Sequence, residues 1–115
     1  MTTPRPDLIR IADMLQAIER IDEVRSTGYE AFAKSWLSQS AVIRELEILG
    51  EAAGSVSAVT RARYPRVEWR RMRGFSSFTK HEYWRVAPQL VWQAVVEMPA
   101  LRRALASSGS ARTKR

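Results

Sequence analysis

The stretch AVIRELEILGEAAGSVSAVTRARY, residues 41–64, decides the fold class of this sequence. Its apolar residues recur at intervals of three and four, which is the spacing of one face of an α-helix. The pattern predicts a helix that is capped by Ser38 or Ser40 and ends before Pro65, because proline disfavours helix at the preceding residue. The expected buried stripe consists of Val42, Leu46, Leu49, Ala53 and Val56.

Two glycines interrupt this segment four residues apart, at Gly50 and Gly54. Glycine inside a helix costs about 1 kcal/mol relative to alanine, so its presence calls for a reason. The pair would let another helix approach the backbone closely. Simple tolerance of glycine is the alternative.

The residues before this stretch predict an amphipathic helix over 7–24 that ends near Thr27-Gly28, a typical stop signal. Residues 29–37 predict a short helical connector, whose Phe32 and Trp36 should pack back on the core.

The residues after this stretch predict a short turn of helix around 67–72 and then a helix from about Phe75 to Arg85. Pro88 suits the first turn of a last helix, and Pro99 should kink it. No run alternates as a strand does and no internal repeat occurs. The sequence therefore predicts an all-α, up-and-down bundle of four to five helices.

The length of 115 residues fits one domain, which we place at 1–106, followed by a disordered basic tail at 107–115. No apolar run approaches the roughly 20 residues of a membrane span, and the start lacks a signal-peptide core, so we expect a cytoplasmic protein. With no cysteine and one histidine, disulfides, thiolate catalysis and a conventional zinc site are not expected. We expect neither a metal nor a cofactor.

Charge is divided unevenly along the chain. Residues 1–60 carry six Lys+Arg and nine Asp+Glu, whereas residues 61–115 carry thirteen and three. The segment 61–73 holds six arginines and one glutamate, with Tyr64 and Trp69 between them. This pattern suits phosphate contacts and base stacking in RNA, and a solvated basic face with two anchoring aromatics explains it equally well.

The single histidine, His81, lies in GFSSFTKHEYWRV, residues 74–86. Cations at Arg73, Lys80 and Arg85 surround it and would lower its pKa, which favours a basic imidazole. Cleavage of RNA by attack of a 2′-hydroxyl needs a proton acceptor, a proton donor and a cation beside the phosphorane. A surface or structural histidine is the alternative, and composition alone favours it.

Three strings together resemble the HepT-type toxins of the HEPN superfamily: 41–53, WRRMRGFSSFTKHEYWRV at 69–86, and LVWQAVVEMPALRRAL at 90–105. The family motif reads W-R-x-x-x-G-M-R-N-x-x-x-H-x-Y-F, and its order and spacing correspond without a gap. The resemblance covers nearly the whole chain.

The resemblance implies an all-α homodimer in which paired R-x(4–6)-H motifs form a metal-independent ribonuclease. It also implies a partner, an MntA-like nucleotidyltransferase antitoxin that neutralises the toxin by transferring AMP from ATP to the tyrosine of H-x-Y. Carried over by position, His81 is the catalytic histidine and Tyr83 the AMP acceptor. The substrate would be an RNA such as tRNA or mRNA. The expected RNA-binding residues are Arg70, Arg71, Arg73, Lys80 and Arg85.

The sequence departs from the motif where the family has Arg-Asn, because Ser76-Ser77 occupy those positions. A serine hydroxyl cannot replace the charge of a guanidinium. Arg73, one turn earlier, and Lys80, beside the histidine, are the candidate substitutes at the catalytic site. The alternative is an inactive HEPN protein that binds a nucleotidyltransferase or RNA without cleavage.

Overall fold

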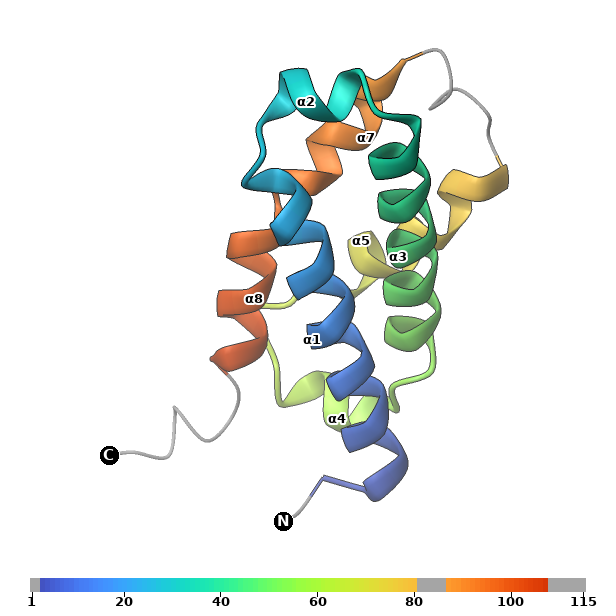
Figure 1. Cartoon of the computed structure of the whole chain (residues 1–115). Helices are drawn as coiled ribbons and strands as arrows, with labels where there is room; N and C mark the ends of the chain where they lie inside the picture. The colour runs from blue at the N-terminus through green and yellow to red at the C-terminus, as the bar shows by residue number, and fades with distance from the viewer. Residues whose placement is uncertain (1–2, 81–86, 108–115) are drawn as a thin grey trace.

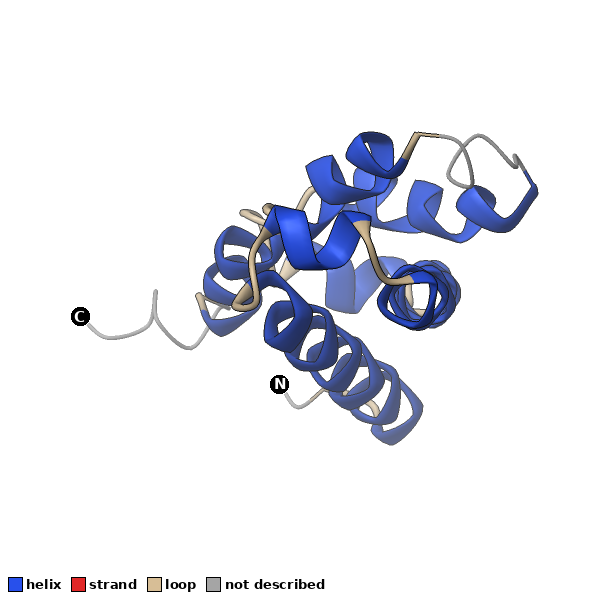
Figure 2. Cartoon of the chain, turned by 45° about the horizontal axis from the view of Figure 1, so that its top comes forward, coloured by secondary structure: helices blue, strands red, loops and turns tan. Residues whose placement is uncertain are grey.

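A computed structural model describes residues 3–80 and 87–107, and within these ranges it contains helices joined by loops and turns, with no strand (Figures 1 and 2). The predicted all-α bundle is confirmed. Helices α1 and α3 lie side by side, α8 flanks α1 on its other side, and α2 contacts α7 at one end (Figure 1). The elements are α1 (Arg5–Arg25), α2 (Tyr29–Ala33), α3 (Trp36–Gly54), α4 (Ala58–Ala62), α5 (Trp69–Gly74), the 3₁₀ helix η1 (Phe75–Lys80), α7 (Pro88–Val95) and α8 (Met98–Ala106).

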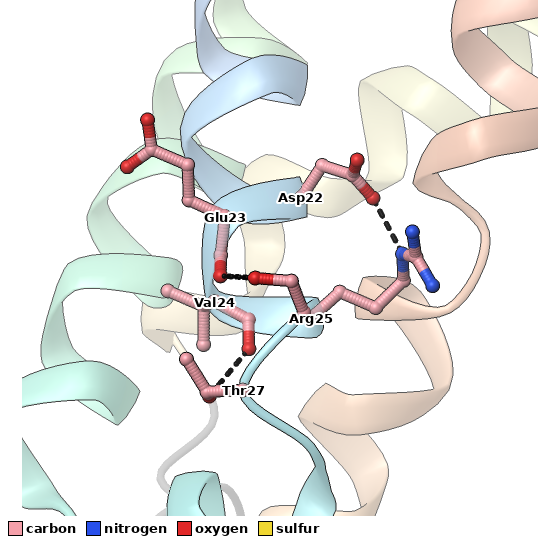
Figure 3. A network of polar contacts seen from close by, with 6 residues as sticks. Asp22, Glu23, Val24, Arg25 and Thr27 are labelled. Atoms are coloured by element: carbon pink, nitrogen blue, oxygen red, sulfur yellow. Dashed lines mark hydrogen bonds and ion pairs between the residues drawn. The ribbon is translucent and has the colours of Figure 1, made fainter.

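Helix α1 ends where the sequence predicted, and its last carbonyls are bonded locally. The hydroxyl of Ser26 donates to the Glu23 carbonyl at 2.6 Å, and that of Thr27 donates to the Val24 carbonyl at 2.7 Å (Figure 3). Gly28 then adopts φ +91°, a conformation that side-chain-bearing residues rarely adopt. The turn redirects the chain into α2.

The start of α3 differs from the prediction. Its cap is Ser35, whose Oγ accepts the Ser38 backbone N–H at 3.1 Å, so the helix begins one turn earlier than Ser38 or Ser40 would allow. Trp36 is consequently the first helical residue and is 72% exposed, so its predicted place in the core is wrong. Phe32 is fully buried, and its ring lies 5.2 Å from that of Trp92 on α7.

The core lies between α1, α3 and the helices that follow residue 69. All five members of the predicted stripe on residues 42–56 are buried. On α1 the buried side chains include Ile11, Met14, Ile18 and Ile21, whereas Leu8 and Leu15 face solvent. No described helix is long and apolar enough to cross a membrane.

A buried carboxylate joins the start of α1 to the start of α4. Asp7 is 4% exposed and accepts hydrogen bonds from the Ser57 N–H at 3.1 Å, the Ser57 hydroxyl at 2.6 Å and the Thr60 hydroxyl at 2.5 Å. The hydrogen bonds from Ser57 and Thr60 hold the pKa of Asp7 below its usual value, although burial opposes them. Asp7 is therefore ionised in the folded protein at neutral pH.

Two of the predicted long helices are divided in the structure, whereas the helix predicted over 7–24 is the continuous α1. The helix expected over 41–64 stops at Gly54, and Ser57 caps the separate helix α4, where its Oγ accepts the Thr60 N–H. The helix expected through Pro99 stops at Val95, and Pro99 lies in the first turn of α8, so the proline begins a new helix rather than bending an old one.

Candidate functional site

The motif segment is formed by α5 and η1, which run on from each other with no break between Trp69 and Lys80. The predicted α-helix over 75–85 is instead a 3₁₀ helix as far as Lys80. Its hydroxyls bond back by three residues: Ser76 Oγ donates to the Arg73 carbonyl at 3.0 Å, and Ser77 Oγ donates to the Gly74 carbonyl at 2.7 Å. Such local bonds compete with the α-helical pattern and match the tighter 3₁₀ turn.

Gly50 fixes how closely this segment lies against α3. A Cβ placed on Gly50 would lie 2.5 Å from the Ser76 nitrogen, 2.8 Å from its Cβ and 3.0 Å from its Cα. These distances are too short for any real Cβ, and the atoms are mostly backbone. The predicted role of this glycine, close approach of a second helix, is confirmed, and its partner is the position where the family motif has arginine.

Gly54, one turn further along α3, lies beside Arg73. A Cβ on Gly54 would meet the Arg73 Cγ at 3.8 Å, which is ordinary contact. Arg73 and Ser76 are three positions apart in the chain, and Gly50 and Gly54 are four positions apart. The two pairs therefore lie opposite each other along neighbouring helices. The arrangement places the stem of Arg73 on the same side of the segment as Ser76.

Lys80 is exposed at the last position of η1. In a 3₁₀ helix with a rise of about 2.0 Å per residue, it lies roughly 8 Å along the axis from Ser76. His81, Tyr83 and Arg85 lie outside the described residues, so the predicted histidine and AMP acceptor have no described geometry.

The arginines of residues 61–73 do not form one uniform basic face. Arg61 donates to the Val56 carbonyl at 2.6 Å, and Arg63 donates to the Thr3 hydroxyl at 3.0 Å. Arg71 forms a two-pronged ion pair with Glu97, and its guanidinium lies 5.1 Å from the centroid of the Phe75 ring. The hydrogen bond with Glu97 raises the pKa of Arg71 above its usual value. These three side chains have structural partners.

The other three arginines of the cluster, Arg66, Arg70 and Arg73, are exposed, and their guanidinium groups form no hydrogen bond or ion pair within the described ranges. Between them, the half-buried Tyr64 and Trp69 rings pack edge to face at 6.3 Å, and the Trp69 indole donates to the Tyr64 carbonyl. The two aromatics therefore support the loop before α5. The roles of Arg70, Arg71, Arg73, Lys80 and Arg85 as RNA contacts stay predictions.

Sequence reasoning missed two long-range contacts, of which the first holds the motif segment in place. The Arg71–Glu97 pair joins α5 to the junction of α7 and α8, and 26 residues separate its members. The Asp7 network spans 50 residues or more. No local sequence pattern predicts either pairing, because other carboxylates of the chain could have formed the same contacts. Among residues 3–80 and 87–107, no group of three metal-ligating side chains occurs.

Helices α5 and η1 together form a continuous helical run whose backbone packs closely against α3. This run exposes cations to solvent. Two of these cations, Arg73 and Lys80, flank Ser76 on either side along the chain. A guanidinium or ammonium group there can stabilise negative charge that develops on a phosphate.

The chain is similar to known proteins over most of its length. A family model described as "Ribonuclease HepT-like" matches residues 14–107. A protein of Caldanaerobacter subterraneus subsp. tengcongensis, named as a candidate RNase, is 31% identical over 104 residues, covering 90% of this chain and 91% of its own. A Thermococcus cleftensis protein, named as a candidate HepT ribonuclease, is 34% identical over 94 residues, covering 80% and 86%. No solved structure matches the chain.

Proposed function

The chain belongs to the HepT-like ribonuclease family, and from that premise we propose that it is the toxin of a toxin–antitoxin pair and cleaves RNA without a metal. The observation that carries the proposal is the match over residues 14–107, which includes all of the motif string at 69–86. The close packing of the motif segment, α5 and η1, on Gly50 supports the proposal, because a catalytic position needs a rigid scaffold.

In this proposal His81 removes the proton of the RNA 2′-hydroxyl, and the resulting oxygen attacks the adjacent phosphorus. The bond to the 5′-oxygen breaks, that oxygen takes up a proton from solvent, to which His81 returns the one it removed, and the products end in a 2′,3′-cyclic phosphate and a 5′-hydroxyl. Two protomers would face their motifs toward one active site, which makes a homodimer the expected assembly.

Arg73 is our choice for the cation that the motif lacks at Ser76. Its stem lies along α3 at Gly54, and its backbone carbonyl accepts the Ser76 hydroxyl, so it is held one turn from the family's arginine position. Lys80 is the alternative, and it lies on the opposite side of Ser76 along the chain. Arginine also matches the two oxygens of a phosphate better than lysine does.

Single-turnover cleavage of tRNA or mRNA in chelator separates the two cations. Arg73→Gln should lower the rate by about 10²–10³, by analogy with removal of an oxyanion donor, while Lys80→Gln should lower it far less. Ser76→Arg should raise the rate, because it restores a guanidinium at the family's position. Equal rates for Arg73→Gln and the parent would contradict the assignment of Arg73.

Neutralisation is proposed to follow the family pattern. An MntA-like nucleotidyltransferase would catalyse attack of the Tyr83 hydroxyl on the α-phosphorus of ATP, with pyrophosphate leaving. The added phosphate would bring negative charge next to Lys80 and Arg85 and would occupy space that RNA needs. Mass spectrometry of the chain after incubation with such an enzyme and ATP should show one or more AMP groups, and Tyr83→Phe should prevent the addition at this site.

A second candidate function is supported by Ser76 itself, which has replaced the family's arginine and donates its hydroxyl to a backbone carbonyl. In that case the protein binds its nucleotidyltransferase partner or RNA and does not cleave. It predicts no cleavage by the parent chain and the appearance of cleavage in Ser76→Arg.

A further inference from the structure

A groove of about 430 Å³ lies away from the motif segment, between the loop that joins α4 to α5 and the last turns of α8. In both views α8 and η1 occupy opposite sides of the molecule (Figures 1 and 2). The groove is therefore separate from the proposed catalytic position. It is lined by Arg66, Ala100, Arg103, Ala104, Ala106 and Ser107.

The charged side chains that line this groove are all positive. Arg66 comes from the loop and Arg103 from α8, both side chains are exposed, and neither forms a hydrogen bond or ion pair through its guanidinium with any residue in the described part of the chain. No carboxylate is among the six lining residues. By contrast, a second groove between α1 and α8 is lined by one cation, Arg102, and one carboxylate, Glu19.

The C-terminal end of α8 lies at this groove, and the partial negative charge of a helix C-terminus repels an anion. Its partial charge is about −0.5, well below the two positive charges of the guanidinium groups. The Ser107 N–H and hydroxyl both donate to the Arg103 carbonyl, at 3.0 Å each, and the same N–H contacts the Ala104 carbonyl at 3.3 Å. Two carbonyls of the last turn of α8 are thus already bonded, and the two arginines dominate the potential of the groove.

The side chains between the two arginines are small. Ala100, Ala104 and Ala106 leave the groove wide enough for a phosphate group. A protein partner would need large apolar or aromatic anchors at its centre, and this groove supplies none from its lining residues. An extended polyanion fits the observations better, since guanidinium groups bind phosphate oxygens in a two-pronged geometry.

We propose that this groove is a second RNA-binding site, in which Arg66 and Arg103 hold the phosphate backbone of the RNA away from the point of cleavage. The inference rests on the proposed function, because it assumes that RNA is the substrate.

The test measures RNA affinity as a function of salt in a His81→Ala background, which prevents cleavage. A labelled single-stranded RNA of about 20 nucleotides is titrated at several salt concentrations. Each phosphate contact on single-stranded nucleic acid contributes about 0.7 to the slope of log K against log salt. Arg66→Gln/Arg103→Gln should therefore reduce the slope by about 1.4 and weaken binding on the order of tenfold near physiological salt.

The matched control is Arg44→Gln/Arg102→Gln, which removes the same net charge from two exposed arginines that do not line this groove, one of them paired with Glu47. It should bind RNA within about twofold of the parent and with an unchanged slope. Equal weakening in the groove and control variants would overturn the proposal, because it would show a diffuse charge effect.

Two further outcomes separate this proposal from the proposed function. If the parent chain cleaves RNA and the groove variant shows an unchanged slope, only the second site is wrong. If no RNA binds to the His81→Ala protein and the parent does not cleave, both proposals fail.

Discussion

Replacing Gly50 by alanine tests the contact that positions the motif segment. The new Cβ would lie 2.5 Å from the Ser76 nitrogen, whereas ordinary contact begins near 3.4 Å, so α3 and η1 must separate by about 0.9 Å (3.4 − 2.5). Overpacking of this kind costs about 1–3 kcal/mol, and the gain from alanine in a helix offsets about 1 kcal/mol. The net loss of unfolding free energy should be about 0–2 kcal/mol.

Gly54→Ala is the matched control, on the same helix and one turn away. Its Cβ would meet only the Arg73 Cγ at 3.8 Å, so the substitution should be neutral or stabilise by up to about 1 kcal/mol. The two alanine variants should therefore differ by about 1–3 kcal/mol, or about 4–12 °C in Tm.

The assays are urea denaturation and RNA cleavage, measured on both variants. Gly50→Ala should also lower the cleavage rate, because it displaces the backbone of Ser76 and the carbonyl contact to Arg73. Gly54→Ala should retain the rate. A Gly50→Ala protein as stable as Gly54→Ala would refute the close packing of η1 on α3.

The remaining predictions concern the core, one ion pair and pH. Phe32→Ala should cost about 3–5 kcal/mol in urea denaturation, while the exposed Trp36→Ala should cost less than about 0.5 kcal/mol. A double-mutant cycle on Arg71 and Glu97 should give a coupling of about 0.5–1 kcal/mol, because both side chains are partly exposed; a zero coupling would remove this pair as a support for α5. The lowered pKa of Asp7 contributes stability above about pH 4 that is lost as the pH falls through its folded value, so Asp7→Asn should flatten this acid loss.

The periodicity of residues 42–56 predicted its buried face correctly, because helical spacing is a local property of the sequence. The helix boundaries were less accurate. Three serines within six residues could each have capped α3, and which one does so depends on where the Gly28 turn leaves the chain. The same ambiguity placed Trp36 in the core although it is exposed.

At the candidate site, the sequence predicted a close approach at Gly50 but not which residue approaches. The answer, Ser76, depends on packing between segments 26 residues apart. The 3₁₀ geometry of η1 was also missed, because it follows from the serine hydroxyls that bond back to the chain. No sequence pattern links Arg66 with Arg103, because only the fold brings the two side chains to one groove.

RNA cleavage by the parent chain and by His81→Ala, compared in chelator with tRNA and total RNA, tests the central claim most directly. The account predicts fragments with 2′,3′-cyclic phosphate ends from the parent and none from His81→Ala. Cleavage that persists in His81→Ala, or that requires added metal, would contradict it.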